Sequence, residues 1–415
     1  MKRNVIVGQS GGPTAAINSS LAGVYRTAID RGAKKVYGMV HGVQGLLNEQ
    51  YLDLSRYIQS DLDVELLKRT PAAFLGSCRY KLPAIHEDKE VYEKLFAILD
   101  KLDIEAFVYI GGNDSMDTIK KLSDYAILTG HQTRFIGCPK TIDNDLALTD
   151  HTPGYGSAAK YIGTSLKEII RDGFCLEYPN GLVTIVEIMG RNAGWLTGAA
   201  ALSKSEDCEG PDLIYLPEVT FDIQDFKAKV KKLLEEKTSV VVAVSEGIRI
   251  ADGRYVCELG NSVDFVDAFG HKQLSGTASY LASFIAGELG AKTRSIELST
   301  LQRAGSHLAS RVDILEAYQV GGAAVKAADE GETGQMVTLE RISDDPYQCQ
   351  TAVKSVHKIA NDEKCVPRNW INKSGTYVTD EFVTYVRPLI QGDVSPVMVD
   401  GIPRHLQIPK ELYRK

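Results

Sequence analysis

The segment Phe135-Ile136-Gly137-Cys138-Pro139-Lys140-Thr141-Ile142-Asp143-Asn144-Asp145 joins an apolar stretch to a run of polar side chains. The apolar part predicts a buried strand, and the polar part begins where that strand ends. In α/β proteins, ligands bind at the carboxyl edge of the sheet. Two carboxylates, an amide, a hydroxyl and a lysine could supply a base, metal ligands and a cation for phosphate. The segment therefore predicts an α/β fold with phosphoryl-transfer chemistry at this edge.

The same order of strand, polar turn and helix recurs along the chain. Residues 5–7 lead into the glycine-rich turn 8–14, and residues 15–28 predict a helix. Glycines let backbone N–H groups approach an anion, and the helix adds positive potential at its amino end. A tight turn without a ligand is an equally good interpretation, because neither the Walker spacing nor the G-x-G-x-x-G spacing is present. Further strand ends are predicted within 106–116, 182–195 and 240–247, and helices over 158–171 and 226–236.

This alternation predicts mostly parallel sheets that are covered by helices on both faces. With 415 residues and 44% hydrophobic content, two domains are favoured over one. We expect two doubly wound, Rossmann-like α/β domains, residues 1–155 and 156–310, with the active site in the cleft between them. From about Tyr347 the pattern loosens. Residues 311–415 are therefore expected to form a returning segment and a C-terminal extension that packs back across both halves.

Charge and cysteine content restrict the classes of partner. A net charge of -7 and a pI near 5.7 argue against a general nucleic-acid surface. Seven cysteines, an odd number without a C-x-x-C pair, indicate reduced thiols and predict a cytoplasmic protein. The polar start at residues 1–4 is not typical of a signal peptide. No stretch approaches the about 20 apolar residues of a membrane span, so we expect no membrane partner and no nucleic acid.

Asp143 is the residue that we expect to act as a general base, because an aspartate with a pKa of about 3.9 is ionised near neutrality. Asp145 and Thr141 flank it at alternate positions, where they could place metal-bound water and a phosphate. Turn capping is the alternative role for these side chains. A second polar turn, residues 111–115, offers backbone donors, the carboxylate of Asp114 and an amide, as a phosphate and magnesium site requires. Taken alone, this turn is better interpreted as a helix N-cap.

Several cations and one further carboxylate follow other predicted strands. The segment 189–191 ends at Arg191, whose guanidinium could clamp a phosphate with two hydrogen bonds. Glu246 lies at another strand end and could accept hydrogen bonds from sugar hydroxyls. Arg294 and Arg303 could bind a sugar phosphate, and Arg79 a donor phosphate. Each of these is equally an ordinary surface or turn charge when it is considered alone.

Taken in order, seven motifs resemble the phosphofructokinase family across about residues 5–313. They are S-G-G-P-T, G-S-C-R-Y, G-G-N-D-S, P-K-T-I-D-N-D, M-G-R-N-A-G-W, S-E-G and R-x8-R. The resemblance implies a cleft that binds fructose 6-phosphate and a phosphoryl donor. It assigns the donor to residues 1–155 and the sugar phosphate to residues 156–310. It also implies that Asp143 deprotonates the 1-hydroxyl of the sugar.

The same resemblance implies three groups of ligand-binding residues. The sugar phosphate is held by Thr141, Asp143, Met189, Gly190, Arg191, Glu246, Arg294 and Arg303. The donor is faced by Gly12, Arg79, Gly112 and Ser115. Magnesium bridges the donor oxygens near Asn113 and Asp145. In-line phosphoryl transfer needs positioning and charge neutralisation more than covalent chemistry, which is consistent with this choice of cations, carboxylates and glycines.

Two positions favour pyrophosphate as the donor. ATP-dependent relatives typically carry G-G-D-G and P-G-T-I-D-N-D, whereas this chain has Asp114 and Lys140 in place of glycines. Asp114 would repel the α-phosphate of ATP by about 1 to 4 kcal/mol at about 4 Å. Lys140 would offer an ammonium to pyrophosphate and stabilise the transition state. The resemblance thus implies the pyrophosphate-dependent branch, with Asp143, Lys140 and Asp114 as catalytic residues and reversible formation of fructose 1,6-bisphosphate and phosphate.

Some positions depart from the family pattern. Asn113 replaces the usual metal-contacting aspartate, so magnesium is expected to bind through water or through Asp145. Leu182 and Thr300 stand where relatives carry an arginine and a histidine, which affects contacts between the subunits of the expected homodimer or homotetramer. The alternatives are an ATP-dependent phosphofructokinase, a non-catalytic regulatory subunit, and a lipid or NAD kinase. Effector regulation and activity on sedoheptulose 7-phosphate stay open.

Overall fold

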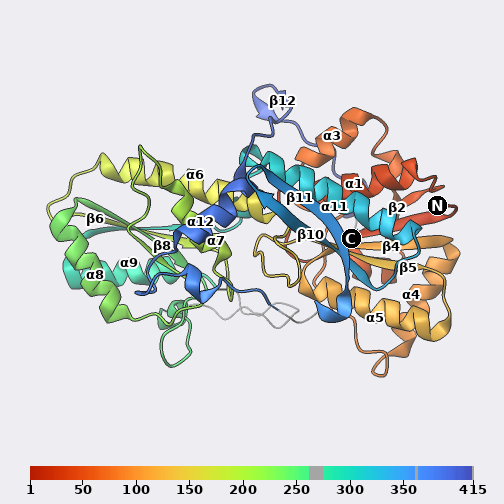
Figure 1. The fold of residues 1–415 in the computed structure, drawn as a ribbon, viewed down its shortest axis with the longest axis horizontal. Coiled ribbons are helices and arrows are strands. Elements are labelled where there is room, and N and C mark those ends of the chain that lie inside the picture. The colour runs from red at the N-terminus through yellow and green to blue at the C-terminus, as the bar shows by residue number, and fades with distance from the viewer. Residues whose placement is uncertain (261–273, 360–362, 414–415) are drawn as a thin grey trace.

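Two separate sheets organise the chain in the computed structural model, which describes residues 1–260, 274–359 and 363–413 (Figure 1). The first sheet has the strand order β11-β10-β5-β4-β1-β2-β3, the order typical of a doubly wound sheet. It is parallel from β2 to β10, and the outer pairs β2–β3 and β10–β11 are antiparallel. Its strands are β1 (Asn4–Gln9), β2 (Val36–Met39), β3 (Tyr51–Asp53), β4 (Ile104–Gly111), β5 (Arg134–Pro139), β10 (Gln335–Asp344) and β11 (Tyr347–Ser355).

Helices cover both faces of the first sheet because successive strand residues point to opposite sides. In β1, Val5 and Val7 pack with the helices of one face, whereas Ile6 packs with those of the other. The first face is covered by α1 (Ile17–Asp30), α3 (Asp61–Arg69) and α11 (Arg311–Asp329). The second face is covered by α2 (Gly42–Leu47), α4 (Lys89–Lys101) and α5 (Asn113–Thr129).

The second sheet is smaller and fully parallel, with the strand order β7-β8-β6-β9. Its strands are β6 (Leu182–Ile188), β7 (Leu213–Tyr215), β8 (Ser239–Ser245) and β9 (Lys292–Glu297). One face packs on α6 (Tyr155–Phe174) and α7 (Trp195–Gly198), and the other on α8 (Ile223–Glu236) and α9 (Thr277–Leu289). Both sheets are thus covered on two sides, which confirms the predicted pair of doubly wound, mostly parallel α/β units.

The last hundred residues cross the molecule more than once (Figure 1). After α11, strands β10 and β11 complete the first sheet, so the looser pattern from Tyr347 belongs to a half-exposed edge strand. Residues 363–390, with α12 (Asp380–Val386), then pack against the second lobe through side chains such as Val366 and Phe382. The chain finally returns over the first lobe, where Leu406 joins the core beside α3 and the hairpin β12 (Met398–Val399) and β13 (Ile402–Pro403) precedes it.

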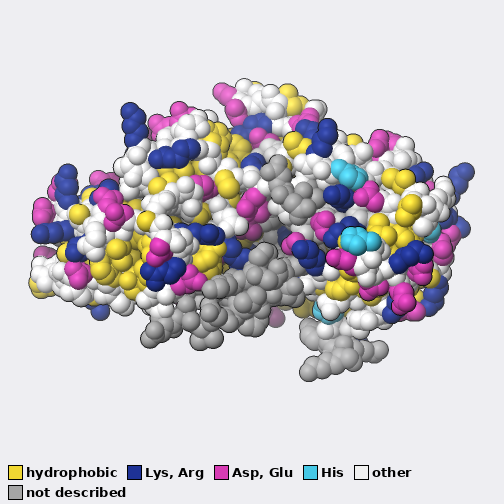
Figure 2. All heavy atoms as spheres, turned by 90° about the horizontal axis from the view of Figure 1, so that it is seen from below, with side chains coloured by type: hydrophobic (Ala, Val, Ile, Leu, Met, Phe, Trp, Pro, Cys, Tyr) yellow, Lys and Arg dark blue, Asp and Glu magenta, His cyan; other side chains and the backbone are white. Residues whose placement is uncertain are grey.

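The surface carries charges of both signs. Figure 2 shows basic and acidic side chains interspersed over the visible face, in agreement with the modest net charge of -7. Among the helices in the described residues, none is long and apolar enough to cross a membrane.

Glycines allow α1 and α11 to pack closely, and this contact joins the returning segment to the first lobe. A Cβ on Gly321 would lie 2.0 Å from the carbonyl oxygen of Ser20, and one on Gly23 would lie 2.0 Å from that of Tyr318. Backbone atoms cannot yield as a flexible side chain can. The two helices therefore require glycine at both positions.

We expect Gly321→Ala to lower the free energy of unfolding by about 1 to 3 kcal/mol, the usual cost of overpacking. The matched control is Gly287→Ala in α9, where a Cβ would meet no atom within 4 Å. That change should be neutral or stabilising by up to about 1 kcal/mol, because alanine is the better helix former. Urea unfolding of both variants measures the difference. Equal effects would contradict the close-packing argument.

Candidate active site

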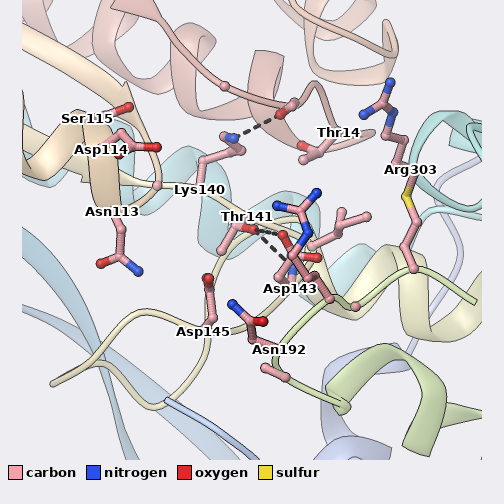
Figure 3. Close-up of a pocket in the computed structure, with 18 of the residues that line it drawn as sticks. Thr14, Asn113, Asp114, Ser115, Lys140, Thr141, Asp143, Asp145, Asn192 and Arg303 are labelled. Carbon is pink, nitrogen blue, oxygen red and sulfur yellow. Dashed lines mark hydrogen bonds between the residues drawn. The ribbon is translucent and has the colours of Figure 1, made fainter. Parts of the chain in front are cut away.

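A cleft of about 490 Å³ lies between the two lobes at the carboxyl ends of their strands (Figure 3). The first lobe contributes the turns after β1, β4 and β5, and the second contributes the turns after β6 and β8. All predicted site residues except Arg294 line this one cleft: Gly12, Arg79, Gly112, Asn113, Asp114, Ser115, Lys140, Thr141, Asp143, Asp145, Met189, Gly190, Arg191, Glu246 and Arg303. Motifs spread over three hundred residues therefore converge, because parallel strands end at one edge.

Lys140 joins the turn after β5 to the glycine-rich turn after β1. Its backbone N–H donates to the carbonyl of Gly111 at 3.0 Å, and its Nζ donates to the carbonyl of Gly12 at 2.8 Å. Gly11 has φ +75, and a Cβ there would stand 3.1 Å from Nζ, so glycine leaves space for the ammonium. Burial lowers the pKa of Lys140 to about 8, although the nearby carboxylates of Asp143 and Asp145 act in the opposite direction.

Asp143 is held by Thr141 through two reciprocal hydrogen bonds (Figure 3). The Thr141 hydroxyl donates to Oδ2 of Asp143 at 3.0 Å and accepts from its backbone N–H at 3.0 Å. This arrangement resembles the turn cap that was the alternative interpretation. It does not exclude chemistry, because the capped carboxylate lines the cleft. A carboxylate fixed in this way is oriented to accept a proton from a ligand hydroxyl.

Two possible metal ligands lie on the wall of the cleft that the first lobe forms. Asp145 is partly buried, and its pKa is raised to about 7 by desolvation and by the neighbouring carboxylates of Asp143 and Glu363. The Oδ1 atom of Asn113 is buried and lacks a hydrogen-bond partner among the described residues. Asn113 begins α5, and Asp114 follows it as an exposed carboxylate in the first turn of the helix. This helix end combines oxygen ligands with N–H groups that can face an anion.

The opposite wall comes from the second lobe. The backbone N–H of Gly190 donates to Glu246 at 3.4 Å, and burial raises the pKa of Glu246 to about 7. The turn after β8 packs directly on the backbone of Arg191, since a Cβ on Gly247 would lie 1.9 Å from the Arg191 carbonyl oxygen. Arg303 lies on the short helix α10 (Leu301–Ala304), and burial and the nearby guanidinium of Arg79 lower its pKa. This repulsion between cations favours an anionic ligand between them.

Arg294 is not in the cleft of its own chain. It lies within β9, where its guanidinium forms an ion pair with Asp172 at 2.8 Å and keeps 38% of the side chain exposed. It lines a second, smaller cavity beside α6, together with Tyr161 and Glu168. Within one chain Arg294 and Arg303 therefore lie in different cavities. Arg294 lies within β9 and points from the face of the sheet, whereas Arg303 lies beyond the end of that strand, on α10.

Asn192 and Glu363 are two of the cleft residues that were not singled out from the sequence. Asn192 lies in the quoted motif after Arg191, and its side-chain amide donates to the carboxylate of Glu363 at 3.3 Å. Glu363 comes from the C-terminal extension and pairs with Leu146 through an isolated β-bridge. The motif could have indicated Asn192. No local pattern marks Glu363, which reaches the cleft only through tertiary packing.

Fold and site together define an α/β enzyme whose interlobe cleft sets Lys140, Arg79, Arg191 and Arg303 against a central carboxylate, an arrangement suited to phosphorylated ligands. The model of the phosphofructokinase family, described as "Phosphofructokinase", matches residues 4–328. The chain belongs to this family. The resemblance inferred from the seven motifs is thereby confirmed.

Individual relatives match over nearly the whole chain. The pyrophosphate–fructose 6-phosphate 1-phosphotransferase of Xanthomonas campestris pv. campestris (strain B100) is 41% identical over 407 residues, which cover 98% of this chain and 96% of that protein. The protein of the same name from Halomonas elongata is 39% identical over 411 residues, covering 99% and 97%. The crystal structure of a pyrophosphate-dependent phosphofructokinase from Nitrosospira multiformis superposes with a TM-score of 0.87 at 37% identity, covering 97% and 95%.

The lowered pKa of Lys140 predicts how anion binding depends on pH. The ammonium form attracts an anion, so the affinity of the cleft for inorganic pyrophosphate should fall as the pH rises through about 8. Calorimetric titration at several pH values measures this loss. The matched control is Lys140→Arg, whose guanidinium stays charged because its pKa exceeds about 12. An identical alkaline loss in that variant would assign the effect to another group or to the ligand.

Proposed function

We propose that the protein transfers a phosphoryl group from pyrophosphate to the 1-hydroxyl of fructose 6-phosphate, reversibly, to give fructose 1,6-bisphosphate and phosphate. One observation carries the choice of donor. The buried ammonium of Lys140 and the carboxylate of Asp114 line the donor side of the cleft, at positions where ATP-dependent relatives typically have glycine. The names of the pyrophosphate-dependent relatives from Xanthomonas and Halomonas support the same choice.

In this reaction the oxygen of the sugar 1-hydroxyl attacks the nearer phosphorus of pyrophosphate, and Asp143 accepts the proton of that hydroxyl. A new P–O bond to the sugar forms while the bridging P–O bond of pyrophosphate breaks, and inorganic phosphate leaves. Thr141 orients the base through its hydrogen bond at 3.0 Å. The ammonium of Lys140, anchored 2.8 Å from the Gly12 carbonyl, neutralises charge on the transferred and leaving groups.

We propose Mg²⁺ as the metal, held near Asn113 and Asp145. The unpartnered amide oxygen and the carboxylate are oxygen ligands, which Mg²⁺ prefers. Within the described ranges no group of three or more His, Cys, Asp or Glu side chains is arranged to hold a metal. The donor oxygens and water would therefore supply most of the coordination sphere, as is usual for Mg²⁺ in phosphoryl-transfer sites. When bound, the ion would neutralise charge on the donor.

A comparison of donors tests the proposed function. At saturating fructose 6-phosphate we expect turnover with pyrophosphate and little or none with ATP. Lys140→Gly should lower kcat/KM for pyrophosphate by about 10²- to 10³-fold, the usual loss when one preorganised charge is removed from a transition state. Asp114→Gly should raise the use of ATP, because it removes a repulsion of about 1 to 4 kcal/mol.

Asp143→Asn is the control for the chemical step, since it retains the shape and removes the base. Saturable turnover with ATP and none with pyrophosphate would show an ATP-dependent phosphofructokinase. Binding of fructose 6-phosphate without turnover of either donor would show a regulatory subunit. Full activity of Asp143→Asn would contradict the assignment of the base.

We also propose that the protein acts as a homo-oligomer, in which Arg294 reaches the sugar phosphate of a neighbouring subunit. The support is its position outside its own cleft, within a separate cavity beside α6. All seven cysteines are free thiols, which supports a cytoplasmic location.

Arg294→Ala should raise KM for fructose 6-phosphate about tenfold and leave KM for pyrophosphate unchanged, because it removes a single charged contact. Oligomers reassembled from Arg294→Ala and Asp143→Asn subunits should regain the wild-type KM for fructose 6-phosphate, since some sites then contain both wild-type residues. Light scattering gives the oligomeric state of each sample. A monomeric wild-type enzyme with full activity would refute the role across subunits.

A further inference from the structure

A short segment of the C-terminal extension, residues 363–366, lies between the loops that carry the two walls of the cleft; we call it the strap. On one side the Lys364 backbone N–H donates to the carbonyl of Asp145 at 2.8 Å. On the other side, Nε1 of Trp195 donates to the Lys364 carbonyl at 2.8 Å. The carboxylate of Glu218 accepts from the backbone N–H groups of Gly194 and Val366 at 2.8 and 2.9 Å. The strap thus joins two loops. The Asp143 loop is residues 140–154, between β5 and α6, and the Arg191 loop is residues 189–194, between β6 and α7.

The ammonium of Lys364 turns inward beneath the Asp143 loop. It donates to the carbonyl of Asp150 at 2.8 Å, to that of Thr149 at 3.2 Å and to Oδ1 of Asn144 at 3.4 Å. It also lies 5.3 Å from the ring centroid of Trp195, within the range of a cation–π interaction. Three oxygen acceptors match the three N–H bonds of an ammonium. The contacts fix this lysine in place rather than leaving it to solvent.

Asn144, which separates Asp143 from Asp145, is the point where these contacts meet. It is fully buried and has φ 54, a left-handed conformation that few side chains tolerate. Its Oδ1 accepts from the Thr152 N–H at 3.0 Å, and its Nδ2 donates to the Tyr385 hydroxyl at 2.9 Å. Rotation of this residue would move both flanking carboxylates. The geometry of Asp143 therefore depends on groups that hold Asn144.

We propose that Lys364 is a positioning residue for phosphoryl transfer, which holds the Asp143 loop at the distance and angle that the reaction requires. The proposal rests on the proposed function of the cleft. It gives the C-terminal extension a part in the reaction, because the strap reaches the loop from outside both sheets. Lys364 does not line the cleft. Its effect must therefore pass through Asn144 and the backbone of Asp145.

Positioning predicts an effect on the chemical step more than on binding. The contacts of Arg191, Glu246 and Arg303 with the sugar side do not involve Lys364, so substrate affinity should be retained. Misplacement of a catalytic group by about 1 Å can cost about 10²-fold in rate. We therefore expect Lys364→Met to lower kcat with pyrophosphate by about 10- to 100-fold and to change KM for either substrate by less than about twofold.

Two further variants make the experiment specific. Lys373→Met is the matched control, since Lys373 is an exposed lysine of the same extension, and it should keep wild-type kcat. Lys364→Gln retains N–H donors without the charge and should have a kcat between those of Lys364→Met and wild type. If Lys364→Met does not fold, Lys364→Gln carries the same comparison. Thermal melting of each variant establishes that folded protein is assayed.

An unchanged kcat per folded molecule in Lys364→Met and Lys364→Gln, with only a lower melting temperature, would overturn the proposal and make Lys364 merely structural. A parallel rise in both KM values with unchanged kcat would overturn it as well. Failure of the proposed function can be distinguished from failure of the proposal for Lys364. If wild type uses ATP in place of pyrophosphate, the donor assignment fails, and the same comparison of variants with ATP still decides the role of Lys364.

Discussion

The burial of one ammonium group, that of Lys140, is the interaction on which the cleft depends. A buried charge costs several kcal/mol unless it is paired and hydrogen-bonded. Lys140 meets this condition through the Gly12 carbonyl at 2.8 Å and through the nearby carboxylates of Asp143 and Asp145. Desolvation, together with the neighbouring carboxylates of Asp143 and Glu363, raises the pKa of Asp145 to about 7. Cation and carboxylates therefore stabilise one another, and the turns after β1 and β5 are held together by the charges that an anionic substrate would meet.

The second lobe also places charged side chains in positions that are partly shielded from water. Glu246 is half-buried near Arg191, and Arg303 lies close to Arg79, so each group has both a like and an opposite charge near it. Both lobes contribute charges of both signs to the cleft: Arg79 and Asp143 come from the first lobe, and Arg303 and Glu246 come from the second. A phosphorylated ligand between the lobes would lie beside cations of both, Arg79 of the first lobe and Arg303 of the second. This explains why the site lies at the junction of two sheets rather than at the edge of one.

Much of this could be predicted from the sequence, for a geometric reason. A polar turn after an apolar strand must lie at the sheet edge, so Lys140, Asp143 and Asp114 were bound to meet once the strands were recognised as parallel. Arg191 follows a strand of the second sheet and meets them because the edges of the two sheets face one cleft. This argument does not apply to Arg294, because Arg294 lies inside β9 and not after it. A side chain within a strand points to a face of the sheet, whereas Arg303 lies beyond the strand end. Motif spacing alone does not separate these two cases.

The sequence predicts that the C-terminal extension packs back across both halves, but not its individual contacts, because these are made with residues hundreds of positions away. Asp313 on α11 accepts hydrogen bonds from the backbone N–H groups of Gly154 and Ser157 at 2.8 and 3.0 Å, and so caps α6 of the second lobe. His151 lies between Asp150 and Glu316, at 2.7 Å from each, and these carboxylates raise its pKa to about 9. A cationic His151 at neutral pH thus ties the end of the Asp143 loop to α11. The loop that carries the base is consequently held from α11 and from the strap together, and its geometry is set by the path of the whole chain.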